Sequence, residues 1–330
     1  MFFYHSLYGL RIISNLPVPG LPVICDHKNS DVIIHLRDKD ARPPGLGRTP
    51  EIFSFTSAHL NAKGEPVLRA GNLNEHYFGL FYDDGARFAV KRDGSEIWAD
   101  GPEDYAVEDI ATYLVGPVMG FVLRLNGVLP LHACAIEVDG RAIALVGQQG
   151  AGKSTAAVGF ARLGYAVLAE DVAAIAEVDG KYIVHPGYPR VNLWPKSVEA
   201  LFGSADSLPQ VTPTWGKQFL ALDGEEFRFQ SRPLPLQAIF MLEERLPGAT
   251  GLRMEPIASA EAMPKLVANT YGNYLLDAAL RGKEFMQLGK LLAKTQIYQV
   301  WPSDDPTRVY ELCHALAGQV QDSAASVVCV

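Results

Sequence analysis

The sequence lacks the cysteine patterns of disulfide-rich, redox and zinc-binding proteins. Its 330 residues contain four cysteines, which form no CxxC pair and have no second cysteine or histidine at convincing ligand spacing. We therefore expect Cys25, Cys134, Cys313 and Cys329 to be reduced thiols that pack as small hydrophobic side chains, a common role of unpaired cysteine. A metal or redox centre built on these residues is disfavoured.

Long apolar runs and basic clusters are also missing. No stretch of about 18 uninterrupted apolar residues occurs, and no basic segment precedes an apolar run at the N-terminus. Lysine and arginine number 29 against 37 aspartate and glutamate, a formal net charge of -8, and no cluster could follow a phosphodiester backbone. These absences predict a soluble, cytoplasmic protein without membrane or nucleic-acid partners, and leave a homo-oligomer open.

The chain is long enough for one large or two medium domains, since a domain usually has about 100 to 200 residues. Residues 1–125 contain short alternating runs separated by Asp-Gly turns, a pattern typical of β-hairpins, and end in an apolar, helix-like stretch from Ile110 to Leu125. We predict a mainly β N-terminal module over residues 1–125 that binds substrate or a partner, and a second domain over residues 126–330.

A mixed sheet is expected in the second domain. Leu131 to Val138, the turn Asp139-Gly140 and Arg141 to Val146 form a predicted hairpin whose second strand leads into a glycine-rich loop. This strand would have an antiparallel neighbour in addition to parallel ones. The predicted fold class is α/β (α+β), with helices from Ser259 onward. Other strands are predicted at 165–169, 172–178, 181–185 and 237–242, with helices at 156–163 and 309–320.

The glycine-rich loop has the sequence GQQGAGKS and fits the P-loop pattern G-x-x-x-x-G-K-[ST] between a predicted strand and a predicted helix. Glycines let backbone N–H groups curl around phosphate oxygens, and the helix N-terminus adds positive potential. Lys153 would reach the β and γ phosphates, and the Ser154 hydroxyl would bind Mg2+. We predict that ATP and Mg2+ bind here. The predicted nucleotide-binding residues are Gly147, Gln148, Gln149, Gly150, Ala151, Gly152, Lys153, Ser154 and Thr155.

Two carboxylates follow the next predicted strand. Glu170 and Asp171 should emerge at the carboxyl edge of the sheet, where the phosphate loop also lies. One acid would hold Mg2+, and the other would orient and deprotonate an attacking hydroxyl, as in kinases. We predict Ser154 and Asp171 as metal ligands, although which acid is the base stays undecided. The alternative is a solvated acidic pair at a strand end.

Three more residues are candidates for the same site. His132, on the hairpin strand, could share a proton or stabilise charge near the γ phosphate, or could be a hydrogen-bonded core histidine. Arg190 and Lys217 are flanked by turn-forming residues, as expected of groups that clamp phosphate, although solvated surface charges have the same pattern.

The order of these motifs resembles the catalytic domain of the HPr serine kinases over about residues 125–200. The resemblance implies a mixed sheet like that of phosphoenolpyruvate carboxykinases. It makes His132 an active-site residue, Lys153 and Ser154 ligands of phosphate and Mg2+, and Glu170 with Asp171 the base and metal pair. The chain departs from the family in having glutamate where the family's acid pair begins with aspartate.

Two other departures concern the substrate. Residues 186–194 contain no acid where the family has a glutamate-containing signature, which argues against the family's reverse, phosphorolytic activity. The N-terminal module is unlike that of HPr kinases, which argues against HPr as the acceptor. With Tyr-Gly-Leu-Arg-Ile at 8–12 and Ala-Asn-Thr-Tyr at 268–271, the chain is more similar to the HPr-kinase-like enzymes of lasso-peptide biosynthesis, which phosphorylate the C-terminal serine of a precursor peptide.

These observations leave three hypotheses. The first is an ATP-dependent serine kinase that acts on a peptide or protein. The second is a nucleotide-dependent regulatory or binding protein, in which the loop senses ATP. The third is a small-molecule kinase, which would differ from the first in having an acceptor that is not a peptide.

Overall fold

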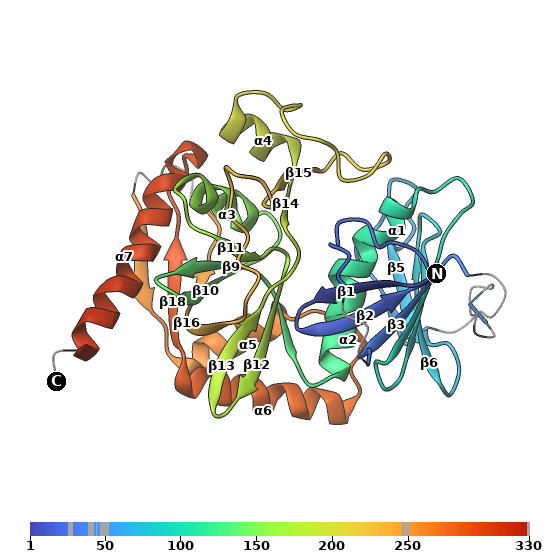
Figure 1. Ribbon diagram of the computed structural model, residues 1–330. Coiled ribbons are helices and arrows are strands. Elements are labelled where there is room, and N and C mark those ends of the chain that lie inside the picture. Colours follow the sequence, from blue (N-terminus) through green and yellow to red (C-terminus); the bar gives the residue numbers. More distant parts are fainter. Residues whose placement is uncertain are drawn as a thin grey trace. The chain divides into compact units, whose positions relative to one another are not determined.

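The computed structural model describes residues 1–25, 29–38, 43, 45–46, 53–245, 248 and 251–328 (Figure 1). It divides into two compact units. The first unit contains Met1–Val128 and two later segments, Thr212–Thr214 and Gly272–Arg281, and the second unit contains the other residues from Leu129 onward. Sequence analysis did not anticipate that the two later segments group with the N-terminal part. Cys329 lies outside the described residues.

The first unit is built on an eight-stranded sheet with the order β1-β2-β3-β8-β7-β6-β5-β4. Its strands are β1 (Phe3–Leu7), β2 (Leu10–Ser14), β3 (Val32–Leu36), β4 (Phe55–Thr56), β5 (Leu68–Asn72), β6 (Tyr77–Tyr82), β7 (Arg87–Lys91) and β8 (Glu96–Asp100). Strand β3 is parallel to both of its neighbours, and the other pairs are antiparallel. The predicted mainly β character is confirmed.

A continuous helical segment packs on this sheet. It consists of α1 (Val107–Tyr113), the π-helical turn η1 (Leu114–Val118) and α2 (Met119–Leu125). The Phe121 and Phe78 rings pack edge to face, with centroids 5.0 Å apart, and Tyr113 lies against Tyr82 at 3.9 Å. Most residues from Ile110 to Leu125 are buried, which explains why this stretch is largely apolar.

The second unit contains a mixed sheet with the strand order β10-β9-β12-β13-β16-β18-β17, an additional β10–β16 pairing, and β11 paired with β9. The strands are β9 (Leu129–Val138), β10 (Arg141–Val146), β11 (Val167–Ala169), β12 (Val172–Val178), β13 (Lys181–His185), β16 (Leu234–Leu242), β17 (Arg253–Pro256) and β18 (Gln296–Trp301). Strand β10 is antiparallel to β9 and parallel to β16. The predicted mixed α/β sheet is confirmed.

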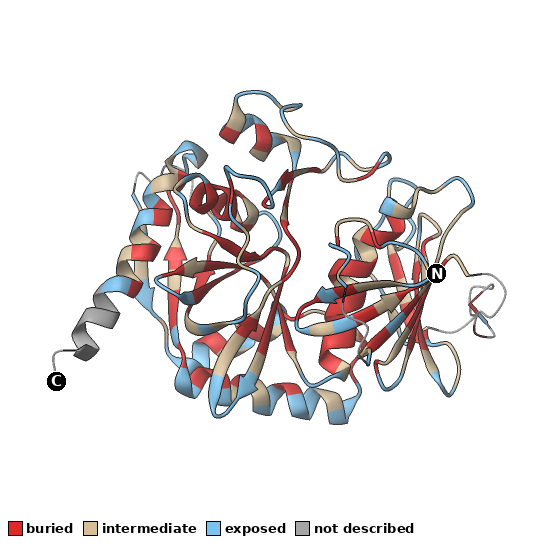
Figure 2. Ribbon diagram, viewed as in Figure 1, coloured by how far each residue is buried: buried red, intermediate tan, exposed pale blue. Residues whose placement is uncertain are grey.

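Two hydrophobic cores cover the two faces of this sheet (Figures 1 and 2). Alternate residues of β10 point to opposite faces: Ile143 and Leu145 belong to one core, while Ala142, Ala144 and Val146 belong to the other. The first core also takes residues from α3 (Lys153–Arg162), α4 (Pro195–Phe202) and α7 (Val309–Val328), and the second from α5 (Ser259–Ala268) and α6 (Ala278–Lys294). Helices therefore cover both faces.

Tight turns set the register of the two predicted hairpins in this unit. Asp139 and Gly140 have φ of 49° and 73°, and Asp179 and Gly180 have φ of 49° and 75°. Positive φ at both central residues is the geometry of a type I′ turn, which Asp-Gly favours because it suits the twist of the flanking strands. Both hairpins were predicted on these turns.

Sequence analysis expected helices from Ser259 onward and did not predict β18. This strand lies between α6 and α7 and pairs in parallel with β16. Its six residues, QIYQVW, are followed by Pro302 but have no Asp-Gly turn beside them, and a short run of this kind does not distinguish strand from helix. A short two-stranded sheet of β14 (Arg190–Leu193) and β15 (Gln218–Ala221) completes the unit, with the 3-10 turns η2 (Asn273–Leu275) and η3 (Pro306–Arg308) elsewhere in the chain.

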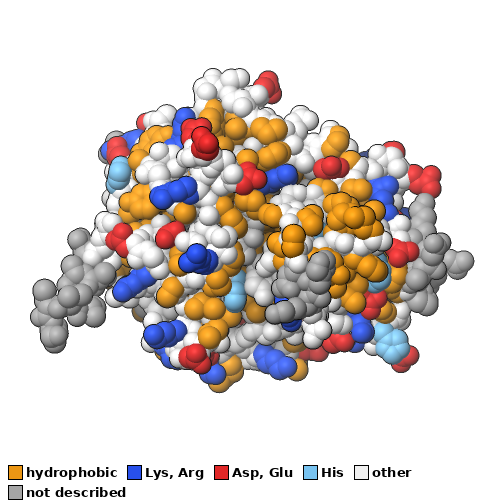
Figure 3. Space-filling view, viewed as in Figure 1, with side chains coloured by type: hydrophobic (Ala, Val, Ile, Leu, Met, Phe, Trp, Pro, Cys, Tyr) orange, Lys and Arg blue, Asp and Glu red, His pale blue; other side chains and the backbone are white. Residues whose placement is uncertain are grey.

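None of the helices in the described ranges is both long and apolar enough to cross a membrane. On the face shown in Figure 3, lysine and arginine side chains are dispersed among acidic and apolar ones.

Candidate nucleotide and phosphoryl-transfer site

The phosphate loop connects β10 to α3 and depends on its glycines. Gly150 and Gly152 have φ of 87° and 97°, a backbone conformation that favours glycine. At Gly147, a Cβ atom would lie only 2.7 Å from the carbonyl oxygen of Leu242 in the neighbouring strand β16. The loop can therefore pass closely over the sheet and place its backbone N–H groups at the start of α3, where helix N-termini bind anions.

Lys153 lies inside this loop and is 6% exposed. Its Nζ donates hydrogen bonds to the carbonyl oxygens of Gly147, at 2.6 Å, and Gln148, at 3.0 Å. Burial lowers the pKa of Lys153 from its usual value, and the neighbouring acids, Asp171 and Glu170, oppose this shift. The ammonium group is thus held at the loop by its own backbone, close to two carboxylates that favour its charged form.

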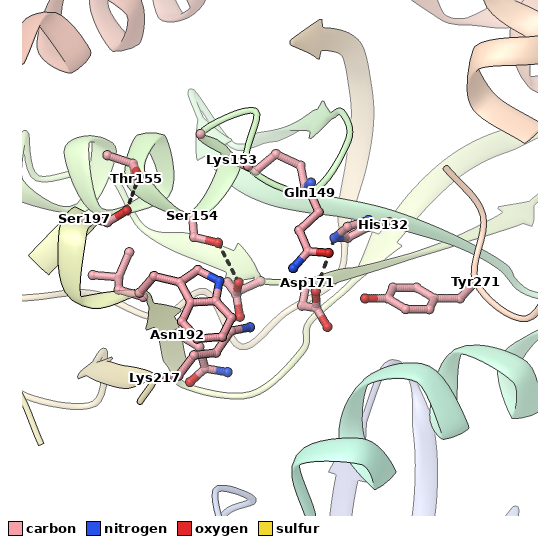
Figure 4. A pocket seen from close by; sticks show the side chains of 15 residues that line it. His132, Gln149, Lys153, Ser154, Thr155, Asp171, Asn192, Ser197, Lys217 and Tyr271 are labelled. Atoms are coloured by element: carbon pink, nitrogen blue, oxygen red, sulfur yellow. Dashed lines mark hydrogen bonds and ion pairs between the residues drawn. The ribbon is translucent and has the colours of Figure 1, made fainter. Parts of the chain in front are cut away.

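Ser154 connects the loop to the acid pair. Its hydroxyl donates a 2.8 Å hydrogen bond to Oε1 of Glu170 (Figure 4). Glu170 is 4% exposed, and its Oε2 atom is buried with no hydrogen-bond partner among the described residues. Burial, followed by repulsion from Asp171, raises the pKa of Glu170 to about 7. An unpaired buried carboxylate oxygen beside a serine hydroxyl is a pair of hard oxygen ligands suited to Mg2+.

Asp171 follows directly and has a different environment. Its Oδ1 lies 3.5 Å from Nε2 of His132, and its side chain is 30% exposed. Burial alone would raise the pKa of Asp171. The opposing effects are larger and lower this pKa to about 2: they are the hydrogen bond and positive charge of His132, the charge of Lys217 and the hydrogen bond of the Tyr271 hydroxyl. Asp171 also has a φ of 68°, in the left-handed region, which is costly for a non-glycine residue.

The topology explains why these residues meet. His132 lies on β9, which pairs with β10 and also with β12, where it is opposite Val172. The backbone N–H of His132 donates to the carbonyl oxygen of Asn269, and the ring lies 5.4 Å from that of Tyr271. The chain turn at Glu170 and Asp171, between β11 and β12, therefore lies beside the phosphate loop.

These groups line one cavity of about 280 Å³. Of the residues predicted for catalysis, His132, Lys153, Glu170, Asp171 and Lys217 all line it. The loop contributes Gln149, Gly150, Gly152, Ser154 and Thr155, whereas Gly147, Gln148 and Ala151 are not among the described residues that line it.

Arg190 and Lys217 differ in position. The Nζ of Lys217 lies 5.2 Å from the ring centroid of Trp194, and both side chains line the cavity. The guanidinium of Arg190 lies over the ring of Phe219, 4.1 Å from its centroid, and Arg190 is outside the set of described residues that line the cavity. The cation–π contact gives this arginine a packing role on the β14–β15 sheet.

Sequence reasoning assigned no role to several lining residues. They are Asn192, Leu193, Trp194, Ser197 and Tyr271. The Ser197 hydroxyl accepts from the Thr155 hydroxyl at 3.1 Å, which ties the start of α4 to the start of α3. Pro195 at the first position of α4 was the available signal, because proline there marks a helix start. Tyr271 ends the Ala-Asn-Thr-Tyr segment that carries part of the family resemblance, but its place in the site was not predicted.

Within the described ranges, no group of three or more histidine, cysteine, aspartate and glutamate residues forms a metal centre. Cys134 is a buried free thiol whose pKa burial raises strongly, Cys313 is also a buried free thiol, and Cys25 is free and exposed. Cys134 and Cys313 are therefore buried as predicted, whereas the prediction that Cys25 packs as a small hydrophobic side chain is wrong. Mg2+ needs no such cluster, since it usually takes one or two carboxylates together with substrate phosphates and water.

The fold and site define an α/β protein with a P-loop between a strand and a helix, facing an acid pair. No protein-family model matches the chain, and a search of curated proteins also finds no match. Among solved structures, the Hpr(Ser) kinase/phosphatase from Coxiella burnetii matches at 10% identity and a TM-score of 0.29, over 60% of this chain and 97% of that chain.

Proposed function

We propose that this chain is an ATP-dependent kinase that transfers the γ phosphoryl group to a serine hydroxyl of a peptide or protein. The acceptor that the motifs favour is the C-terminal serine of a lasso-peptide precursor. One observation supports the proposal above all: Lys153 and Ser154 of the phosphate loop share a cavity with Glu170 and Asp171. Phosphoryl transfer depends mainly on positioning and charge neutralisation, and this cavity contains groups for both.

The loop residues would act on the nucleotide. Backbone N–H groups at the start of α3 would hold the phosphates, and Lys153 would exchange its hydrogen bonds to Gly147 and Gln148 for phosphate oxygens. Lys217, which also lines the cavity, would add a second positive charge near the transferred group.

Glu170 and Ser154 would hold Mg2+. Glu170 has a buried, unpaired Oε2, and its Oε1 accepts a hydrogen bond from the Ser154 hydroxyl. This arrangement fits the role better than Asp171, the ligand predicted from the sequence. When bound, the ion would neutralise charge on the phosphoryl oxygens. Because the Glu170 pKa is raised to about 7, part of this carboxyl is protonated near neutral pH, and binding of a cation there would release that share of protons.

Asp171 would orient the acceptor. Its low pKa keeps it ionised at neutral pH, and its partly exposed carboxylate can accept a hydrogen bond from an acceptor hydroxyl while His132 holds the other side. The separation of the two pKa values assigns different tasks to adjacent acids. As the serine oxygen bonds to the γ phosphorus, the bond from that phosphorus to the β–γ bridging oxygen would break and ADP would leave, while the serine proton passes toward Asp171.

Intact-mass spectrometry of candidate acceptors tests the proposal. Precursor peptides with a C-terminal serine, the same peptides with alanine in its place, and HPr are incubated with the protein, ATP and Mg2+. We expect one phosphate on the serine-ending peptide only. No phosphate on any peptide or protein acceptor, with nucleotide still bound, would contradict the proposal and favour a small-molecule kinase or a regulatory nucleotide-binding protein.

A further inference from the structure

A second cavity, of about 530 Å³, lies against the same phosphate loop. It is lined by loop residues 148–151, by Leu242 at the end of β16 and residues 243–245 after it, and by Trp301 at the end of β18. Gln149 and Gly150 line both this cavity and the candidate catalytic cavity, so the loop is their shared wall. A ligand with its phosphates on the loop can therefore extend from one cavity into the other.

The two cavities lie on opposite sides of β10. Glu170 and Asp171 follow β11, which pairs with β9 on one side of β10. On the other side β16 and then β18 run parallel to β10, so their carboxyl ends reach the same edge of the sheet as the phosphate loop. Ligands of α/β sheets bind at this edge, which places the second cavity where the rest of a nucleotide would extend.

Its lining combines one aromatic ring with polar and charged side chains. Trp301 is partly exposed, and the guanidinium of Arg253 lies 4.3 Å from its ring centroid. Leu242 adds aliphatic surface, and a volume of about 530 Å³ is within the range of small-molecule sites. The carboxylate of Glu243 accepts from Lys265 and, at 2.7 Å, from Gln299. Glu243 and the exposed Glu244 bring negative charge to this cavity, which makes it unfavourable for a phosphate.

One cation lining this cavity lies close to the loop. The Nη2 atom of Arg245 is 3.4 Å from the position that a Cβ atom of Gly152 would occupy, and its Nη1 donates to the carbonyl oxygen of Ser303 at 3.2 Å. Arg245 is thus held at the junction between loop and cavity, where a guanidinium can contact a phosphate that leaves the loop.

We infer that the second cavity binds the nucleoside of the nucleotide, with a purine base against Trp301 and Arg245 at the phosphate nearest the ribose. This rests on the proposed function only in that a nucleotide binds the phosphate loop. Stacking on an aromatic side chain contributes to base binding without specifying one base, so the surface fits adenine and guanine alike.

Calorimetric titration with ADP and with inorganic pyrophosphate tests the inference. Pyrophosphate occupies the loop only, so it reports loop integrity. We expect Trp301→Leu to weaken ADP binding about tenfold, as loss of a base–aromatic contact does, and to leave pyrophosphate binding within about twofold. Arg245→Met should also weaken ADP binding. Unchanged ADP affinity in Trp301→Leu, with normal pyrophosphate binding, would overturn the inference.

Trp194→Leu is the matched comparison, because Trp194 is the exposed tryptophan of the catalytic cavity. A loss of ADP affinity in this variant but not in Trp301→Leu would place the base in the other cavity and overturn the inference. The outcome is separate from the kinase proposal. If ADP binding depends on Trp301 but no acceptor is phosphorylated, the nucleoside site stands and the kinase proposal fails. If an acceptor is phosphorylated but ADP binding does not depend on Trp301, the kinase proposal stands and the nucleoside site fails.

Discussion

The two sides of the phosphate loop differ in the chemistry of their side chains. On one side, Glu170 contacts Ser154, and Asp171 contacts His132. The pKa of Glu170 is raised and that of Asp171 is lowered. On the other side, Trp301 offers an aromatic surface, and the acid nearest the sheet, Glu243, is already held by Lys265. Under the proposed function, this difference would place reaction and recognition on separate surfaces that share one loop.

Replacement of the lysine of the phosphate loop should have the largest effect. Lys153→Ala removes the ammonium group that lies inside the loop, so we expect phosphoryl transfer to fall by about 10³-fold or more and ADP binding to weaken as well. Lys181→Ala, at an exposed position of β13, is the control for loss of a lysine. Transfer by Lys153→Ala at the rate of the control would refute the assignment of the loop.

Glu170 gives a pH-dependent prediction. Its folded-state pKa of about 7 lies above its ordinary value of 4.5, so its contribution to stability is complete below about pH 4.5 and is lost as pH rises through about 7. Glu170→Gln removes this titration. At pH 8 the variant should exceed the wild type in free energy of unfolding by on the order of 3 kcal/mol, and at pH 4.5 the two should be nearly equal.

Urea unfolding of both proteins between pH 4.5 and 8 measures this difference. Parallel stability curves would show that Glu170 titrates as an ordinary carboxyl. Titration of Mg2+ in buffers of different ionisation enthalpy gives an independent check, because the wild type should release a proton on binding and Glu170→Gln should not.

The smallest expected effects on kcat/KM are those of replacing Lys217 and Arg190, the two residues predicted to clamp phosphate. Lys217→Ala should lower kcat/KM by about ten- to a hundredfold, because its ammonium group lines the catalytic cavity. Arg190→Ala should change it by about twofold or less, since that guanidinium lies on Phe219. A steady-state comparison of the two variants measures the difference, and a larger loss in Arg190→Ala would reverse the assignment.

The sequence was sufficient to predict the elements that depend on local signals. Asp139-Gly140 and Asp179-Gly180 need positive φ, and the glycines of the phosphate loop allow close passage over the sheet, so both hairpins and the loop were predicted at their observed places. The acid pair was predicted beside the loop for the same reason, since it directly follows a strand that ends at that edge.

The remaining features depend on contacts between distant segments. Nothing near Trp301 in the sequence indicates that its strand pairs with β16, and nothing near Tyr271 indicates its place beside His132. The choice between Glu170 and Asp171 was open for the same reason. It depends on which acid reaches Ser154 and which reaches His132, and that follows from the backbone turn at Asp171.

Single-turnover transfer from ATP by Asp171→Asn, with ADP affinity measured on the same preparation, tests the central claim most directly. This change removes the carboxylate charge that would orient the acceptor, and it leaves the phosphate loop and the Trp301 cavity intact. We predict a transfer rate lower by about 10² to 10⁴-fold, with ADP affinity within about threefold of the wild type. Transfer at the wild-type rate would contradict the separation of reaction from recognition, and so would an equal loss of ADP binding.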